Sequence, residues 1–205
     1  MTEAIANNTS ADAVGRGAEN RERIVAAADR LFYERGFQAT SFSDIADAAG
    51  VPKGNFYYYF KTKDALLEGV IDWRRNCLKA LLDNLNRTYD NPRERLMALL
   101  QGLCAGEDDI VRYGCPMGTL SAELCKSGHP LRERAQALLE MIRDWIATQL
   151  QLMGQDDPLE LAREIQTRSQ GVTLLAHAYG DHGMLSEGMA RVRRWVESVL
   201  DGRSH

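Results

Sequence analysis

The sequence has 205 residues, of which 44% are hydrophobic, and a formal net charge of −4. A chain of this length and composition can bury a sizeable core and is typical of a globular protein. No apolar run reaches the roughly 18 residues that a membrane span needs, and the first twenty residues lack the apolar stretch of a secretion signal. These features exclude a membrane partner and predict a cytoplasmic protein.

The negative net charge argues against a nucleic-acid partner, but the charges are unevenly distributed. From Arg16 to Lys63 there are eight basic and six acidic residues, whereas from Asp64 onward there are 17 basic and 21 acidic residues. The first of these segments is therefore the candidate for contact with phosphate groups.

The first predicted elements are a tail and two helices. Residues 1–19 are small and polar, which predicts a mobile tail. Apolar residues then recur at helical spacing until Gly36, which predicts the first helix. Ser41 can cap a short second helix, with Asp44 three residues later favouring the same start, and Gly50 ends it.

A third helix is predicted to begin at Pro52, which suits a first helical turn. Two short helices joined by a tight turn predict a helix-turn-helix. At about 100° per residue, four residues share one arc of the third helix: Lys53, Gly54, Tyr57 and Tyr58. Lysine and tyrosine can contact phosphates and base edges, and glycine admits close approach. Phe56 and Phe60 are predicted core residues, whereas burying Tyr57, Tyr58 and Tyr59 together would leave three hydroxyls seeking partners.

The rest of the chain is predicted to be helical as well. A long helix capped by Thr62 carries an apolar stripe of Leu66, Val70, Trp73, Cys77, Leu81 and Leu85. Asn91 and Asp157 are each followed by proline and then glutamate, which marks two further helix starts. Helices are placed at about 92–105, 116–126, 130–153, 158–179 and 186–200. Almost no stretch alternates as a strand should, so the sequence predicts an all-α fold of about nine helices.

The segment "RERIVAAADRLFYERGFQATSFSDIADAAGVPKGNFYYYFKTKDALL", residues 21–67, resembles the DNA-binding module of TetR-family transcriptional repressors. The match has no gap and covers about a quarter of the chain. The resemblance implies a three-helix DNA-binding domain over residues 20–66 and an effector-binding and dimerisation domain over residues 67–205. It also implies a homodimer that places each third helix in the major groove of a palindromic operator.

Carried over position by position, the resemblance implies two groups of DNA contacts. Base edges and nearby backbone would be met by Lys53, Gly54 and Tyr57. Phosphates would be met by Thr40, Ser41, Ser43, Tyr58, Tyr59 and Lys63. Pro52 departs from the family pattern, in which serine or threonine commonly caps the recognition helix, and this removes one possible hydroxyl contact.

The resemblance further implies that the last two helices pack with their mates in a four-helix bundle. The expected interface residues are Leu174, Leu175, Ala178, Val192, Val196 and Val199, with packing inside the monomer as the alternative. A small-molecule effector would bind in the second domain. The expected ligand-binding residues are aromatic, pliable or reactive: Trp73, Tyr113, Cys115, Met117, Met141, Trp145 and His177. Ordinary core packing is the alternative for each of them.

The segment "YGCPMGTLSAELCKSGHPLRER", residues 113–134, resembles part of a TetR-family branch that includes repressors of electrophile-detoxifying reductases. In members of that branch, the cysteine that matches Cys115 senses reactive chlorine or electrophiles. Cys115 precedes Pro116 and so is expected at a helix N-terminus, where the dipole favours a thiolate. The alternative is a small buried apolar residue. Cys125 could be a resolving partner only if the two Cα atoms lie within about 7 Å.

Two other classes of protein have less support. Cys115, Cys125 and His129 could bind a metal, but their spacing matches no structural zinc pattern. An enzyme with Cys115 as nucleophile and His129 or His177 as base lacks a recognisable orienting carboxylate and oxyanion site. The sequence therefore predicts a ligand- or thiol-responsive repressor with no metal, cofactor or enzymatic activity.

Overall fold

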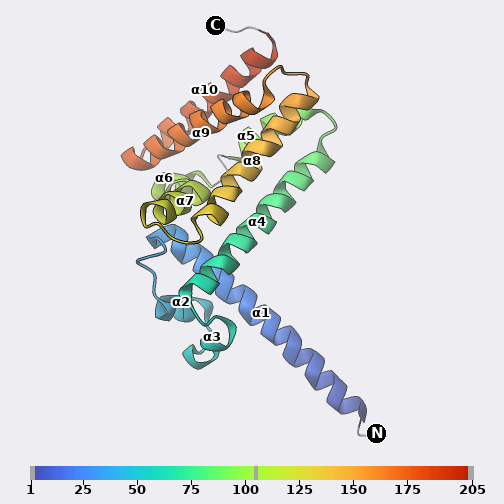
Figure 1. Ribbon diagram of the computed structural model, residues 1–205, viewed down its shortest axis with the longest axis vertical. Helices are drawn as coiled ribbons and strands as arrows, with labels where there is room; N and C mark the ends of the chain where they lie inside the picture. Colours follow the sequence, from blue (N-terminus) through green and yellow to red (C-terminus); the bar gives the residue numbers. More distant parts are fainter. Residues whose placement is uncertain (1–2, 104–105, 203–205) are drawn as a thin grey trace. The chain divides into compact units, whose positions relative to one another are not determined.

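The computed structural model describes residues 3–103 and 106–202, and the side chains of these residues from Gly17 onward except that of Lys53 (Figure 1). All regular structure in this part of the chain is helical, which confirms the all-α prediction. The helices are α1 (Glu3–Arg35), α2 (Phe42–Ala49), α3 (Lys53–Tyr59), α4 (Lys63–Thr88), α5 (Pro92–Gly102), α6 (Glu107–Tyr113), α7 (Pro116–Lys126), α8 (Arg132–Leu152), α9 (Pro158–Tyr179) and α10 (His182–Leu200).

The helices form two compact units, Met1–Arg74 and Arg75–His205, and α4 contributes to both. The division falls further along α4 than the boundary after residue 66 that the sequence suggested. The first turns of α4 pack on the first unit, because Gly69 lies against Val25 and Phe60. Arg74 on α4 also forms an ion pair with Asp29 on α1.

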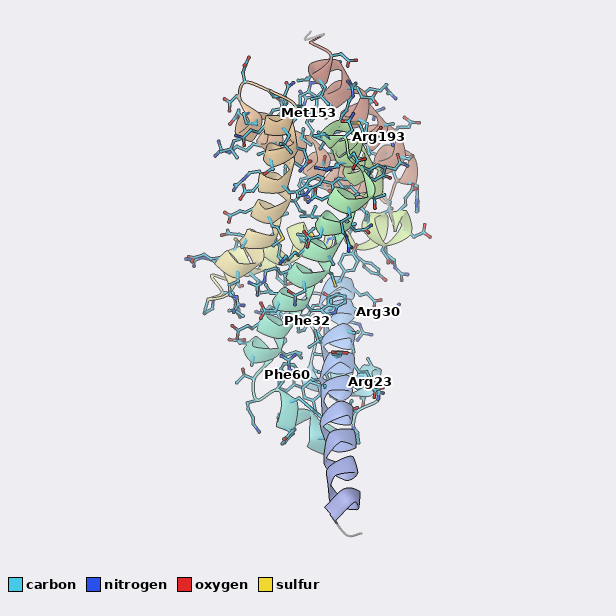
Figure 2. All side chains as sticks on the ribbon, turned by 90° about the vertical axis from the view of Figure 1, so that its right-hand side faces the viewer. Arg23, Arg30, Phe32, Phe60, Met153 and Arg193 are labelled. Atoms are coloured by element: carbon cyan, nitrogen blue, oxygen red, sulfur yellow. The ribbon has the colours of Figure 1, made fainter. Side chains whose placement is uncertain are left out.

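The first unit has a core of its own, built from one face of each helix. Figure 2 labels Phe32 on α1 and Phe60 just after α3, and both are buried. The buried apolar residues of this unit are Ile24, Val25, Ala28, Leu31, Phe32, Phe37, Ile45, Ala46, Ala49, Val51, Phe56, Phe60, Leu66, Leu67, Val70 and Ile71. Full burial of one leucine, isoleucine or phenylalanine side chain contributes about 1.5–3 kcal/mol. This core fixes α3 against α1, α2 and α4.

The start of α1 differs from the prediction. The helix begins at Glu3, whereas the polar composition of residues 1–19 predicted a mobile tail. This stretch has several alanines and no proline, a composition that allows helix. Because the segment has no apolar stripe, the sequence analysis did not recognise that one helix runs from Glu3 to Arg35. Mobility of the segment in solution stays a prediction.

The buried stripe of α4 was predicted correctly at Leu66, Val70 and Leu85, which are buried, but wrongly at the three positions between them. Trp73 and Leu81 are 41% and 49% exposed, and Cys77 is exposed, whereas Leu78 and Leu82 are buried. The true stripe passes through a charged position, Arg74, whose side chain is only 5% exposed. Pattern reading passes over such a position, because a buried arginine needs a partner that sequence alone does not reveal.

In the second unit, two helix starts have the caps that the sequence predicted. The side chain of Asn91 accepts a hydrogen bond from Arg93 N at 2.8 Å, and that of Asp157 accepts one from Glu160 N at 3.4 Å. Asp181 caps α10 through Met184 N at 3.0 Å, so this helix begins earlier than predicted. The sequence analysis missed α6, because a helix of two turns shows too little periodicity.

The core of the second unit lies among the later turns of α4 and the helices α5, α8, α9 and α10, with α7 packed on α8 and α6 packed on α9. Figure 1 shows α9 and α10 running side by side. Gly188 on α10 is buried against α9, since a Cβ there would lie 2.7 Å from a methyl carbon of Val172. The glycine therefore lets α10 pack closely on α9. Leu174 and Leu175 of α9 lie outside this contact and are exposed.

Candidate functional site

The turn between α2 and α3 is held by caps at both ends of α2. Ser41 Oγ accepts a hydrogen bond from Asp44 N at 3.2 Å, and Asp44 Oδ2 accepts one from Ser41 N at 2.9 Å. Gly50 ends α2 with a φ of 62°, in the left-handed region that favours glycine. The predicted Ser41 cap and glycine stop are confirmed, and the side chain of Asp44 completes a capping box. Val51 is buried after the turn, which fixes where α3 begins.

The seven residues of α3 separate into an anchored face and an exposed face. Phe56 is 1% exposed and its ring centroid lies 4.9 Å from that of Phe42. Tyr57 and Tyr58 are 53% and 80% exposed. Gly54 is also exposed, and a Cβ added there would meet no atom of the chain within 4 Å. The fold therefore does not require a glycine at this position. The absence of a side chain here would instead allow another molecule to approach the helix closely.

Two of the predicted DNA contacts are only partly exposed to solvent. Tyr59 is partly buried, and its hydroxyl accepts a hydrogen bond from Asn20 Nδ2 at 3.4 Å. Lys63 Nζ donates to the carbonyl of Gln38 at 3.2 Å and lies 4.4 Å from the ring centroid of Phe37. The side chain of Lys53 lies outside the described residues, and its base contact stays a prediction.

The structure corrects the role predicted for Thr40. Its side chain is 1% exposed, and its hydroxyl donates to the carbonyls of Gly36 at 2.8 Å and Leu31 at 3.3 Å. It therefore closes the C-terminal end of α1 and cannot reach a phosphate. Ser41 is exposed, but its hydroxyl donates to Asp44 Oδ2 at 2.6 Å and so serves the cap. Ser43 is exposed on the first turn of α2, as a phosphate contact requires.

Two arginines of α1 were missed by the sequence analysis. Arg23, labelled in Figure 2, is exposed and donates from Nη2 to the carbonyl of Ala49 at 2.6 Å. The guanidinium of Arg21 lies 5.2 Å from the ring centroid of Phe60. These cations add positive charge beside α2 and α3, which suits an anionic partner. Both arginines lie in the basic segment from Arg16 to Lys63 that the sequence analysis named as the candidate for phosphate contact, but neither was singled out there.

The second unit contains a pocket of about 300 Å³ at the start of α7. It is lined by Gly114, Cys115, Gly118, Thr119, Ala122, Gln170, Gly171, Thr173, Leu174 and His177. The pocket brings together two of the predicted ligand-binding residues, Cys115 and His177. Gln170 was not predicted, because its place opposite Cys115 depends on how α9 packs.

Cys115 is partly buried at the N-cap position of α7, as its place before Pro116 predicted. Its sulfur accepts hydrogen bonds from Gly118 N and Gln170 Nε2, both at 3.4 Å. His177 Nδ1 lies 3.1 Å from the carbonyl of Val111. A carbonyl can only accept, so Nδ1 carries the proton, and in the neutral ring Nε2 is the acceptor.

Cys125 cannot resolve an oxidised Cys115 within one chain. Both residues belong to α7, Cys115 as its cap and Cys125 in its last turns. Ten residues of α-helix span about 15 Å, roughly twice the Cα separation that a disulfide tolerates. An intrachain disulfide between them is therefore excluded while α7 is intact.

The other predicted ligand-binding residues lie elsewhere. Met117, Met141 and Trp145 are partly buried and pack against the core of the second unit. Tyr113 is partly buried, with the guanidinium of Arg112 5.2 Å from its ring centroid, and Trp73 lies on α4 in the first unit. Within the described residues, two buried polar atoms have no hydrogen-bond partner, Trp145 Nε1 and Ser121 Oγ. Such atoms are uncommon in native interiors.

The predicted interface residues divide into two groups. Val192 and Val196 are 5% and 0% exposed and belong to the core of the second unit. Their assignment to an interface is wrong, because side chains already buried in one subunit have no surface to offer. Leu174 and Leu175 are 64% and 49% exposed on α9. Ala178 is exposed and Val199 is partly exposed, and for these residues the interface stays a prediction.

Two negative findings apply to the described part of the chain. No helix there is long and apolar enough to cross a bilayer. No group of three or more histidine, cysteine, aspartate or glutamate side chains there could hold a metal ion.

Comparisons with known proteins agree with this geometry. The model of the family described as "Bacterial regulatory proteins, tetR family" matches residues 24–70. A helix-turn-helix transcriptional regulator from the lacX 3' region of Lactococcus lactis is 29% identical over 190 residues, which cover 87% of this chain and 94% of the relative. The transcriptional regulator LmrA of Bacillus subtilis is 32% identical over 132 residues, covering 62% and 67%.

The transcriptional repressor NemR of Escherichia coli is 29% identical over 119 residues, covering 56% of this chain and 58% of NemR. The crystal structure of the reduced form of NemR matches this fold with a TM-score of 0.72 at 24% identity, covering 85% of this chain and 96% of that chain. The chain therefore belongs to the TetR family of transcriptional regulators. Its relatives are regulators and not enzymes, and TetR regulators bind DNA and small-molecule effectors and typically act as dimers.

Proposed function

We propose that this chain is a cytoplasmic repressor that binds a palindromic operator as a homodimer and is released by a small-molecule effector or by modification of Cys115. The observation that carries the first part is the division of α3. Gly54, Tyr57 and Tyr58 are exposed on a short helix that Phe56 and Phe60 anchor from behind. A rigidly anchored helix with an open polar face is what major-groove reading requires.

Release is a matter of differential affinity. Two recognition helices bind one operator only if their spacing is about 34 Å, one turn of DNA, or a multiple of it. A ligand that binds more tightly to a dimer with a different spacing lowers the DNA affinity. The size of the decrease is set by the ratio of the ligand's affinities for the two states. The continuous helix α4 contributes to both compact units and is the element through which such a preference can be transmitted.

A selection experiment tests the DNA-binding function. Purified protein is mixed with sheared genomic fragments, and the bound fragments are sequenced. We expect enrichment of an inverted repeat, and a fall in affinity for it as salt rises, because phosphate contacts release counterions. Bound fragments without twofold symmetry would contradict the dimeric mode of binding. Genes beside the enriched fragments would indicate the class of effector.

Tyr57 provides the first residue-level prediction. Replacing it with alanine is expected to weaken operator binding by about 1–3 kcal/mol, the usual value of a good base contact. The ring also packs edge-on against Phe42, with centroids 5.7 Å apart, so Tyr57→Phe serves as the control that preserves this packing. Fluorescence anisotropy on the selected operator and on scrambled DNA measures both variants. Unchanged operator affinity in Tyr57→Ala would show that this residue does not contribute to operator binding.

The second part of the proposal is supported by the surroundings of Cys115. The thiol lines a pocket of about 300 Å³, large enough to admit a small electrophile. Two N–H groups face the sulfur, and a thiolate is the form that reacts with electrophiles. A relative, the repressor NemR, has a crystal structure described as its reduced form, which supports a redox-sensitive repressor as one reading of this site.

Replacing Cys115 with serine separates DNA binding from thiol response. We expect Cys115→Ser to bind the operator as tightly as the unmodified protein and to remain bound after treatment with N-ethylmaleimide. Cys125→Ser is the matched control, since Cys125 is exposed on the same helix and is expected to leave the response intact. A mobility shift before and after treatment gives the result. Normal release of Cys115→Ser by N-ethylmaleimide would overturn the assignment.

A further inference from the structure

The pocket around Cys115 shares its rim with an exposed apolar seam on α9. Four residues of α9 form this seam: Gly171, Leu174, Leu175 and Ala178. All four are exposed, and their spacing of i, i+3, i+4 and i+7 places them on one face of the helix. Leu174 is 64% exposed and Gly171 is exposed, yet both also line the pocket that holds Cys115. The mouth of the pocket therefore opens on the seam.

We propose that α9 of a second copy of this chain packs along the seam and closes the Cys115 pocket, so that the thiol site is complete only in the dimer. This inference rests on the dimer of the proposed function and adds to it the place where the effector site meets the dimer contact. A ligand or adduct too large for the closed pocket must then displace the partner helix.

Gly171 indicates that the occupant is a helix that comes close. A glycine inside a helix costs about 1 kcal/mol relative to alanine. No contact within its own chain requires a glycine at position 171, because a Cβ there would meet nothing within 4 Å. It also lines the neighbouring groove between α9 and α10, with Val172, Leu175 and Gly188. A residue without a side chain at the centre of an exposed face allows another backbone to approach closely.

The seam is self-complementary, which indicates a second copy as the occupant. Gly171 forms a hollow and Leu174 and Leu175 project beside it, so two seams related by a twofold axis can place leucines into hollows. Charged residues of both signs flank the groove, where Arg168 pairs with Glu164 at 2.6 Å and Arg191 pairs with Glu187 at 3.5 Å. A mixed pattern of this kind does not repel its own copy. Regulators of this family typically act as dimers, so such a partner is available.

The test compares how fast Cys115 reacts in the dimer and in a monomeric variant. A single-cysteine protein that retains only Cys115 is labelled with a bulky reagent, fluorescein maleimide. Leu175→Glu opens the seam without changing the pocket, since Leu175 is exposed and lines only the neighbouring groove. A single-cysteine protein that retains only Cys125, exposed on the same helix, is the matched control. Analytical ultracentrifugation reports the mass of each protein.

We expect Leu175→Glu to be monomeric and to label at Cys115 at least about tenfold faster than the dimer, since a covered site reacts only when it opens. Labelling of Cys125 should be the same in both. Ala178→Glu, one turn from Leu174, should give the same result and guards against a local defect of one variant. Equal Cys115 rates in a confirmed dimer and a confirmed monomer would overturn this inference and leave the proposed DNA-binding dimer intact. A dimer that survives both substitutions would instead refute the α9 face itself.

Discussion

Replacing Gly54 with leucine is expected to weaken operator binding roughly a hundredfold or more while the protein stays folded. A leucine side chain on the exposed face of α3 would occupy the space that the DNA surface needs. We expect a loss of about 3 kcal/mol or more, roughly a hundredfold in affinity. Because a Cβ at Gly54 meets no atom of the chain, the free energy of unfolding should rise by up to about 1 kcal/mol from improved helix propensity.

The operator affinity and the free energy of unfolding are expected to change in opposite directions, which distinguishes a lost DNA contact from a folding defect. Loss of binding together with loss of stability would mean only that α3 is damaged, whereas loss of binding with equal or higher stability assigns the exposed face to DNA. Gly102→Leu is the matched control, because Gly102 lies in α5 and a Cβ there also meets nothing within 4 Å. Anisotropy on the operator and urea unfolding measure the two effects. Retained operator affinity in Gly54→Leu would refute α3 as the recognition helix.

Removing Asp29 alone is expected to destabilise the first unit strongly. Arg74 is 5% exposed and its Nε donates to Asp29 Oδ1, while its Nη2 lies 3.5 Å from the Asp29 carbonyl. Asp29→Ala would leave the guanidinium buried without its carboxylate, which costs about 3–5 kcal/mol for a buried pair. Asp29 is itself 19% exposed, so we expect a loss near the lower end of that range.

The double variant Asp29→Ala with Arg74→Met should recover most of that loss. Methionine keeps much of the apolar volume of arginine and removes the buried charge, and replacing a buried pair with apolar residues is often neutral or stabilising. Urea unfolding of both single variants and the double variant gives the coupling energy. A loss below about 1 kcal/mol in Asp29→Ala would show that water screens the pair. In that case the pair would not be what fixes the start of α4 on α1.

The exposed face of α3, formed by Gly54, Tyr57 and Tyr58, was largely predictable because the sequence features that define it lie within a few residues of one another. Ser41, Asp44 and Gly50 satisfy the backbone groups of α2 within a few residues, and caps of this kind depend little on distant contacts. Helical periodicity alone put Phe56 on the opposite face from Tyr57 and Tyr58. Thr40 was assigned to a phosphate by the resemblance alone, and its hydroxyl instead bonds to the end of the preceding helix. Only the position of α1 decides between the two.

The sequence by itself determined the helical class, most of the helix boundaries and the exposed face of α3, because these depend on propensity, capping and periodicity. Tertiary structure decided the rest. It placed Arg74 in the core through its pairing with Asp29, buried Val192 and Val196 within the subunit, and brought Gln170 and His177 to Cys115. The physical reason is the same in each case. The burial of a side chain and the partner of a polar group depend on contacts between helices far apart in the chain, and no local pattern encodes those contacts.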